Sequence, residues 1–287
     1  MRAKFPTLLL IFLVTNLCAA FSFIITSQVA FAAHLPIPKS FGLIIAFVLL
    51  LAVTLFSLYR FGKRLGKSPI LWTIGIALGL MVVGNVATSS LNATFKYMPL
   101  YFTWGLSLYT GYHFSKLKKP LVPVIIALFP LVFGLGFYDQ WAYRFDYGTW
   151  SGEVAGEPGQ NFRFLTKEGY WVSHESLRGK IVLLDFWFAS CLPCWKKFPE
   201  LQRIYELYED RPDFALFAVN RGDDPEILFG LIAEKGYTFP VLRGTKEEIS
   251  GLGVSWFPTV MLINQRGEVV FKGDLEDAEA KLASLLR

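Results

Sequence analysis

The hydrophobic and polar positions divide this chain into two halves of different character. The first half contains five long stretches without Asp, Glu, Lys or Arg, and each can cross about 30 Å of hydrocarbon as a helix. This pattern predicts an all-α, multi-pass transmembrane domain over residues 1–140. The expected spans are Thr7–Ala30, Phe41–Tyr59, Ile70–Leu91, Met98–Phe114 and Leu121–Tyr138.

The first of these spans has a second interpretation, a cleaved signal peptide. Arg2 and Lys4 form a basic start, and Ala30-Phe31-Ala32 resembles the small-residue site where such peptides are cut. The apolar stretch is long for a signal peptide, which favours a retained helix. Either version leaves the second half of the chain on the same side of the membrane.

The basic residues indicate the orientation of the helices, because short loops rich in Lys and Arg lie in the cytoplasm. They occupy alternate connections, which places the N-terminus inside and everything after Tyr138 outside. The sequence therefore predicts a multi-pass membrane protein whose second half lies on the extracytoplasmic face. The residues concerned are Arg2, Lys4, Arg60, Lys63, Arg64, Lys67, Lys116, Lys118 and Lys119.

Composition agrees with this division and limits the partners. Of the 287 residues, 53% are hydrophobic and 18% are charged, which is too apolar for one soluble domain. The formal net charge of +5 arises largely from the predicted cytoplasmic loops, so no nucleic-acid partner is needed to explain it.

The second half is predicted to be a linker over residues 141–158, which are polar and glycine-rich, followed by a compact domain over residues 159–287. The centre of this domain is a buried strand over Ile181–Phe188, a helix from Cys191 to about Tyr208 and a strand over Phe214–Asn220. A βαβ unit of this kind pairs its strands in parallel.

Other elements flank the central unit. They are expected as a hairpin of Phe162–Leu165 and Tyr170–Val172, a helix from Asp224 to Lys235, an extended segment at Phe239–Leu242, a helix near Lys246–Leu252, strands at Thr259–Asn264 and Glu268–Lys272, and a helix over Leu275–Leu286.

Cys191 and Cys194 stand two residues apart at the predicted strand-to-helix junction. The unsatisfied amides at the start of the helix favour a thiolate on Cys191. Such a thiolate attacks a disulfide of a partner, and Cys194, one helical turn away, resolves the mixed disulfide. The spacing therefore predicts thiol-disulfide exchange.

A zinc site is the alternative for this spacing, but it needs two further Cys or His ligands. The remaining candidates lack ligand spacing, so the redox interpretation is favoured and no metal or cofactor is expected. These candidates are Cys18, His34, His113 and His174.

Asp185 is the single charge in the predicted buried strand. Burial without a partner is costly for a carboxylate and raises its pKa. A perturbed acid of this kind suits the role of proton acceptor for Cys194, because such acids cluster at functional sites. A satisfied structural acid is the alternative.

Further motifs surround the two cysteines, namely Asp185-Phe186-Trp187 before them, Pro199 five residues after the second, Tyr237-Thr238-Phe239-Pro240-Val241, and Phe257-Pro258-Thr259. With these motifs, roughly Gly156 to Arg287 resembles the thioredoxin superfamily, and within it the membrane-tethered TlpA/ResA-like thiol-disulfide oxidoreductases. The resemblance implies an α/β thioredoxin-like domain, with a central mixed sheet flanked by helices.

The resemblance also implies roles for individual residues. Cys191 is expected to be the exposed nucleophile, Cys194 the more buried resolving thiol, and Asp185 the buried acid. Pro258 is expected to follow a cis peptide bond that places the Phe257 backbone beside Cys191, where a substrate segment can pair with it.

Three nearby residues have two interpretations each. Pro193 shapes the redox potential or is an ordinary first-turn proline. Trp187 and Phe257 form an apolar rim that binds substrate, or they pack in the core.

The chain departs from the family pattern at two positions. Lys197 stands three residues after the second cysteine, where some reductive relatives carry Glu. A cation there would favour a thiolate, although a solvated helix face is the interpretation that we favour. Ser190 replaces the tryptophan that usually precedes the first cysteine.

The membrane half contains a single cysteine, Cys18, and so lacks the pair needed to pass electrons by dithiol exchange within one chain. A separate dithiol relay protein in the membrane is therefore the expected electron donor. The membrane half itself is expected to anchor the domain or to bind a partner.

The sequence thus predicts an enzyme that reduces or exchanges disulfides in exported proteins, with cytochrome c maturation as one candidate process. A peroxide-reducing redoxin is an alternative, although Phe188 stands where peroxidases place the threonine that binds peroxide. A membrane binding or assembly protein with a redox-regulatory domain is the third interpretation.

Overall fold

The computed structural model describes residues 4–27, 39–115, 121–158 and 161–287. Two compact units, Met1–Phe145 and Asp146–Arg287, make up the chain, and each is considered by itself. The predicted cleavage motif at residues 30–32 and the basic residues at 116–119 lie outside the described residues.

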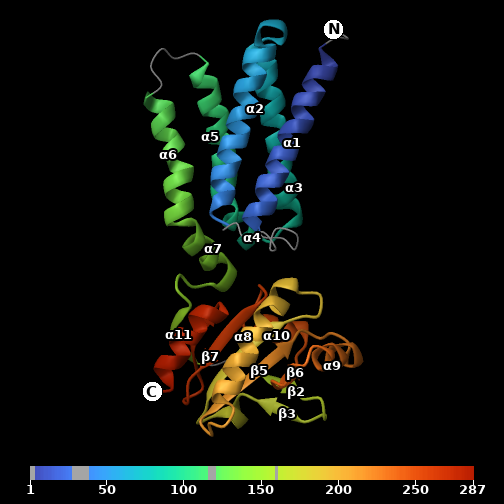
Figure 1. Cartoon of the computed structure of the whole chain (residues 1–287), viewed down its shortest axis with the longest axis vertical. Coiled ribbons are helices and arrows are strands. Elements are labelled where there is room, and N and C mark those ends of the chain that lie inside the picture. The colour runs from blue at the N-terminus through green and yellow to red at the C-terminus, as the bar shows by residue number, and fades with distance from the viewer. Residues whose placement is uncertain (1–3, 28–38, 116–120, 159–160) are drawn as a thin grey trace. The chain divides into compact units, whose positions relative to one another are not determined.

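The first unit is all-helical, and its long helices lie antiparallel and side by side (Figure 1). Apolar residues of α1, α2, α3 and α5 form its core, including Ala19, Leu50, Ile74 and Trp104. Helices α1 and α2 approach closely, since a Cβ atom on Gly42 would lie 2.0 Å from Thr26 Oγ1. The helices are α1 (Phe5–Ser27), α2 (Phe41–Leu65), α3 (Lys67–Thr88), α4 (Leu91–Lys96), α5 (Met98–Phe114), α6 (Leu121–Gly136) and α7 (Tyr138–Tyr147).

Within the described residues, three helices, α1, α2 and α3, are long and apolar enough to cross a membrane. The fourth and fifth predicted spans form α5 and α6, with 17 and 16 residues. At 1.5 Å per residue, helices of this length fall short of the roughly 30 Å hydrocarbon layer unless the bilayer adapts. Five crossings therefore stay a prediction.

The second unit contains an eight-stranded mixed sheet in the order β1-β8-β7-β4-β5-β6-β2-β3. The strands β4, β5 and β6 are parallel, and β7 joins β4 in antiparallel register. The strands are β1 (Glu153–Pro158), β2 (Arg163–Leu165), β3 (Trp171–Ser173), β4 (Ile181–Trp187), β5 (Phe214–Asn220), β6 (Val241–Arg243), β7 (Thr259–Ile263) and β8 (Glu268–Gly273).

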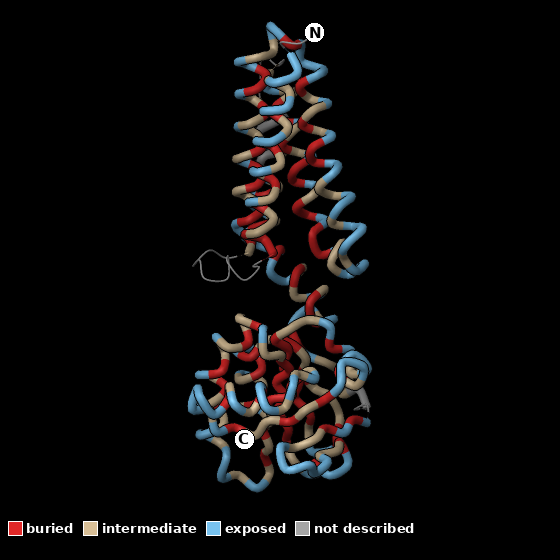
Figure 2. The backbone as a smooth tube through the Cα atoms, turned by 90° about the vertical axis from the view of Figure 1, so that its right-hand side faces the viewer, coloured by how far each residue is buried: buried red, intermediate tan, exposed pale blue. Residues whose placement is uncertain are grey.

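Helices cover both faces of this sheet, which confirms the predicted thioredoxin-like α/β fold. Side chains of α8, α9 and α11 pack on the face that carries Leu183 and Trp187 of β4. The short helices η2 and α10 pack on the face that carries Val182 and Phe186. Figure 2 shows buried residues concentrated inside this unit. The helices are η2 (Glu175–Leu177), α8 (Leu192–Tyr208), α9 (Pro225–Glu234), α10 (Lys246–Gly251) and α11 (Leu275–Leu285).

The prediction that residues 141–158 form an unstructured linker is wrong. Its first part belongs to α7, and Glu153–Pro158 forms β1, an edge strand paired antiparallel with β8. An edge strand tolerates glycine and proline because one side of its backbone needs no partner strand. The composition that indicated a linker is therefore also compatible with a strand in this position.

Candidate active site

The two cysteines lie where the central strand β4 gives way to α8. Cys191 is the N-cap of α8, and its Sγ accepts a hydrogen bond of 3.2 Å from the Cys194 amide. The two residues form a disulfide with a Cα–Cα distance of 5.3 Å. A helix amide therefore points at the Cys191 sulfur, as the sequence predicted, and stabilises negative charge there.

Both cysteines are buried in this disulfide form. Cys191 is 3% exposed and Cys194 is fully buried, and both belong to the apolar cluster beneath α8. The order of exposure agrees with the prediction, but the description of Cys191 as exposed does not. The disulfide holds its sulfur against Cys194, one turn into the helix.

Asp185 points to the same face of the sheet as the cysteines. Side chains alternate along a strand, and its neighbours Leu183 and Trp187 pack in the cluster that contains Cys191 and Cys194. Asp185 is 2% exposed, and its Oδ1 atom has no hydrogen-bond partner among the described residues. Burial raises the pKa of Asp185 to about 8, Lys197 acts in the opposite direction, and Asp274 raises it further.

Lys197 is tied to the start of α11 rather than solvated. Its Nζ lies 2.5 Å from Asp274 Oδ1 and 2.7 Å from Glu276 Oε2. The side chain is only 21% exposed. The interpretation of Lys197 as part of a solvated helix face is therefore wrong, because two carboxylates from a distant helix cover it. Its charge also acts on Asp185.

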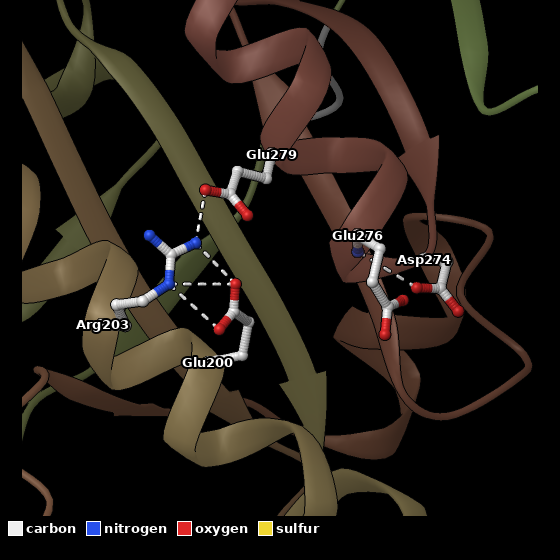
Figure 3. Close-up of polar contacts among 5 residues, drawn as sticks. All are labelled: Glu200, Arg203, Asp274, Glu276 and Glu279. Carbon is white, nitrogen blue, oxygen red and sulfur yellow. Dashed lines mark hydrogen bonds and ion pairs between the residues drawn. The ribbon is translucent and has the colours of Figure 1, made fainter.

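A second set of polar contacts joins α8 to α11, as Figure 3 shows. The Arg203 guanidinium contacts Glu279 of α11 and lies 2.5 Å from Glu200 Oε1 of its own helix. In the same view the Asp274 carboxylate accepts a hydrogen bond of 3.2 Å from the Glu276 amide. Exposed ion pairs contribute little stability, so these contacts link α8 to α11 without adding much to the stability of the domain.

We expect the Lys197→Met substitution to raise the pKa of Asp185, because the charge that lowers it is removed while Asp274 remains. If Asp185 accepts the Cys194 proton, the pH midpoint of mixed-disulfide resolution moves upward. Stopped-flow measurement of that step from pH 6 to 9 tests this. Lys196→Met, at the exposed neighbouring position, serves as the control. An unchanged midpoint in Lys197→Met would contradict the expectation.

Two hydrogen bonds at the backbone of Ala189 hold the segment between β4 and α8. The Ala189 amide donates to Asp223 Oδ2 at 2.5 Å, and its carbonyl accepts from Trp195 Nε1 at 2.8 Å. Asp223 is held in turn by the buried Asn220, whose Nδ2 donates to the same carboxylate oxygen at 2.7 Å. The turn after β5 therefore positions the residues that precede Cys191.

Sequence reasoning missed this turn, although a signal for it exists. The strands β4 and β5 are parallel, so their carboxyl ends share one edge of the sheet, where α/β folds place their sites. The polar run Asn220-Arg221-Gly222-Asp223 directly follows β5 and therefore lies beside the cysteine loop. The Arg221 amide donates to the Trp187 carbonyl at 2.9 Å.

We expect Asp223→Ala to destabilise this loop, because it leaves the buried Asn220 amide and the Ala189 N–H without their acceptor. A buried donor without a partner costs about 1–3 kcal/mol. Hydrogen exchange of peptides covering residues 186–195 measures the loss of protection, and Asp210→Ala at an exposed helix end is the control. Equal protection in both variants would show that the hydrogen bonds to Asp223 do not stabilise the loop.

The two aromatic residues predicted as a rim have different positions. Trp187 is fully buried and packs edge-on against Trp195 and Phe198, at centroid distances of 5.2 and 4.9 Å. Its proposed place at a substrate-binding rim is wrong, because it points inward from the last position of β4. Phe257 is half-buried, and its ring lies 5.4 Å from that of Phe188.

The two predicted prolines lie at the same end of the sheet. The Phe257–Pro258 peptide bond is cis, as expected, and Pro258 is buried. It directly precedes β7, whose first residue, Thr259, pairs with Phe186 near the end of β4. Pro193 lies in the first turn of α8 and is half-buried.

Across the described part of the chain, no group of three metal-ligating side chains is placed to hold an ion.

Comparison with known proteins identifies relatives of this chain. Residues 155–272 match the AhpC/TSA family. The chain is 30% identical over 149 residues to the thiol-disulfide oxidoreductase ResA of Halalkalibacterium halodurans, a match covering 51% of this chain and 80% of that protein. It is also 30% identical over 176 residues to ResA of Geobacillus thermodenitrificans, covering 59% of this chain and 98% of the relative.

Solved structures are similar over about half of the chain. A putative thiol:disulfide interchange protein DsbE from Chlorobium tepidum is 27% identical, with a TM-score of 0.42, over 47% of this chain and 96% of that one. A putative protein disulfide isomerase from Bacteroides thetaiotaomicron is 25% identical, also with a TM-score of 0.42.

Proposed function

Because this chain belongs to the ResA family of thiol-disulfide oxidoreductases, we propose that it reduces or exchanges disulfides in exported proteins on the outer side of a bacterial cytoplasmic membrane. It is an enzyme of thiol-disulfide chemistry with a thioredoxin-like domain and a CxxC pair. The observation that carries the proposal is the Cys191–Cys194 disulfide at the start of α8, with the unpartnered Asp185 on the same face of the sheet.

The reaction uses both cysteines and the acid in turn. The Cys191 thiolate attacks a substrate disulfide, so that a mixed disulfide forms and one substrate thiolate leaves. The Cys194 thiol then passes its proton to the Asp185 carboxylate and attacks the Cys191 sulfur. The enzyme disulfide forms, the second substrate thiolate leaves, and two electrons have passed to the substrate. A dithiol donor of the membrane restores the reduced pair.

The exposed surface of the first unit supports a place in the membrane. Its helices carry large apolar side chains at 60–70% exposure, among them Leu17, Val83 and Val132. Such a surface is costly in water and matches the hydrocarbon of a bilayer. The burial of Ala19 and Ile25 of α1 among the other helices supports a retained first helix rather than a cleaved one.

The charges at the two ends of the helical unit support the orientation. Lys4, Arg60, Lys63, Arg64 and Lys67 lie at the end where α1 begins, α2 ends and α3 begins (Figure 1). The opposite end of the described helices carries fewer basic residues, namely Lys39, Lys96 and Arg144, together with Asp139. The positive-inside rule assigns the first end to the cytoplasm. Since α6 runs towards the opposite end, the redox domain follows on the outer side.

Two measurements, one in intact cells and one in spheroplasts, test this proposal. Acid quenching followed by alkylation with a mass tag reads the state of Cys191 and Cys194, and a mostly reduced pair is expected for a reductase. Protease added to spheroplasts is expected to digest the domain beginning at Asp146. A mostly oxidised pair would contradict reduction, and a protected domain would contradict the orientation.

Apocytochromes are one candidate class of exported substrate. If they are the substrate, haem staining of membranes from cells that lack this protein shows reduced covalent c-type haem, and a chain carrying Cys191→Ser fails to restore it. Normal c-type haem in such cells would direct the search to other exported proteins.

A peroxidase activity is the second candidate, because residues 155–272 match the AhpC/TSA family. Phe188 stands in place of the threonine that peroxidases use, and its ring packs against Phe257. We therefore expect slow consumption of hydrogen peroxide by the reduced protein, and rapid consumption would favour the peroxidase.

The third interpretation, an assembly protein, predicts partner complexes that persist when both cysteines are replaced.

A further inference from the structure

Arg221, the residue directly after β5, lies against two aromatic rings at the redox site. Its Cζ atom lies 4.9 Å from the ring centre of Phe188 and 4.8 Å from that of Phe257. The two rings meet edge to face, at an interplanar angle of 81°. Contacts of a guanidinium with aromatic rings are attractive and limit its movement.

Both rings belong to the segments that surround the disulfide. The carbonyl of Phe188 accepts the Cys191 amide at 3.0 Å. Phe257 precedes the cis Pro258. The backbone of Arg221 is fixed as well, because its amide donates to Trp187 at the end of β4. The guanidinium is therefore positioned by the same segments that hold the reactive sulfur.

The charge of Arg221 has no carboxylate partner within the described residues, and no hydrogen-bond acceptor for its guanidinium is found there. The two acids that follow it in sequence are engaged elsewhere. Asp223 accepts from Ala189 and Asn220, and Asp224 caps α9 by accepting from the Glu226 amide at 2.9 Å. Arg221 is half-buried, so part of it still reaches solvent.

A guanidinium that contacts aromatic rings keeps its N–H groups at its edge, where they match the two oxygens of a carboxylate. Because the rings already restrict the side chain, little conformational entropy is lost when it binds. We infer that Arg221 binds a carboxylate of the disulfide-bearing polypeptide beside its reactive cysteine, and so selects acidic substrates. This inference rests on the proposed function and adds the substrate class to it.

The test uses the reduced full-length protein in nanodiscs and synthetic peptide disulfides. The peptides have one sequence in which the residue next to the cysteine is Glu, Gln or Lys, each with an amidated C-terminus. A fourth peptide has Gln at that position and a free C-terminal carboxylate. The Glu peptide and the fourth peptide distinguish a side-chain carboxylate from a terminal one.

We expect kcat/KM of the wild-type protein to be about 10-fold higher for one of the carboxylate peptides than for the neutral peptide, mainly through KM, and to lose this preference at high salt. In Arg221→Gln the ratio of kcat/KM between the carboxylate peptide and the neutral peptide falls to about one, because the charge that binds the carboxylate is gone. Arg221→Lys keeps part of the preference, because it retains charge without the planar fork. Arg211→Gln removes the same charge at the opposite end of β5, where Arg211 pairs with Asp213 at 2.9 Å, and keeps the preference.

Two results would overturn the inference. One is equal reduction of all four peptides by the wild-type protein. The other is a uniform loss of rate on every peptide in both Arg221 variants, which would show that the residue only packs the loops together. Failure of the wild-type protein to reduce any peptide is a distinct result, which would overturn the proposed function and the inference with it.

Discussion

Cys191→Ser is expected to lower kcat/KM for the reduction of insulin disulfides by the full-length protein by at least ~1000-fold, because it removes the nucleophile. The reason is the N-cap position of Cys191, where the Cys194 amide donates to its sulfur. A helix N-terminus lowers the pKa of a thiol far enough to supply a thiolate. A serine hydroxyl at the same place stays protonated at neutral pH and does not attack sulfur.

Cys194→Ser has a different outcome that separates the two roles. The first attack still occurs, so the variant accumulates a mixed disulfide with its substrate, which non-reducing electrophoresis and mass spectrometry detect. Cys18→Ser is the matched control, because Cys18 lies on the apolar helix α1 of the other unit, and it keeps wild-type activity. Retained activity in Cys191→Ser, or trapping by Cys191→Ser instead of Cys194→Ser, would contradict these roles.

Asp185→Asn slows the resolution of the mixed disulfide by about 100-fold at neutral pH, since general-base catalysis is worth about 10²–10⁴-fold. Burial raises the pKa of Asp185 to about 8. The wild-type rate of this step therefore rises with pH up to about that value, and the variant loses this rise. Stopped-flow measurement of thiol release between pH 6 and 9 tests the step. Asp277→Asn, at an exposed position of α11, is the control.

The same substitution increases stability at neutral pH. Asp185 keeps its proton in the folded state up to about pH 8, whereas the unfolded chain releases it near pH 4. Because the folded state binds more protons in this window, the free energy of unfolding falls as pH rises, by about 1.4 kcal/mol for each pH unit. Below about pH 4 the contribution of Asp185 to the free energy of unfolding is fully present, and above about pH 8 it no longer changes with pH.

Asn carries no charge, so Asp185→Asn avoids this loss. The stabilisation of the variant over wild type grows from about pH 4 and reaches on the order of 5 kcal/mol by pH 8. Hydrogen exchange of peptides from β4 and β7 in increasing urea, at pH 5, 6, 7 and 8, measures it. A difference that does not vary with pH would show that the Asp185 carboxyl has an ordinary pKa.

These two predictions concern residues that the sequence alone singled out. Cys191 and Cys194 were found by their spacing at the end of an apolar run, and Asp185 was found because a charge inside such a run is rare. The βαβ unit was predicted because each strand has a strong local pattern. Boundaries that rest on local signals agree closely, as with the helix that ends at Tyr208 and the strand Phe214–Asn220.

Other features depend on partners far away in the sequence. Residues 153–158 form a strand only because β8 offers an edge to pair with. The local pattern around Lys197 predicts a solvated side chain, but the start of α11 places Asp274 and Glu276 against it. Trp187 and Phe257 have the same apolar character, and their depth in the fold decides that one is core and the other half-exposed.

By itself, therefore, the sequence determined the division into an apolar helical half and a thioredoxin-like half, the redox pair and the buried acid. Each of these follows from a local sequence pattern, namely the periodicity of apolar residues, the spacing of two cysteines or a single charge in an apolar run. Only the tertiary structure decided the surroundings of the site, namely the Asn220–Asp223 support, the Lys197 contacts and the contacts of Arg221 with two aromatic rings. These join segments 30 or more residues apart, and no local pattern encodes which of them meet, because parallel strand pairing and helix packing set those contacts.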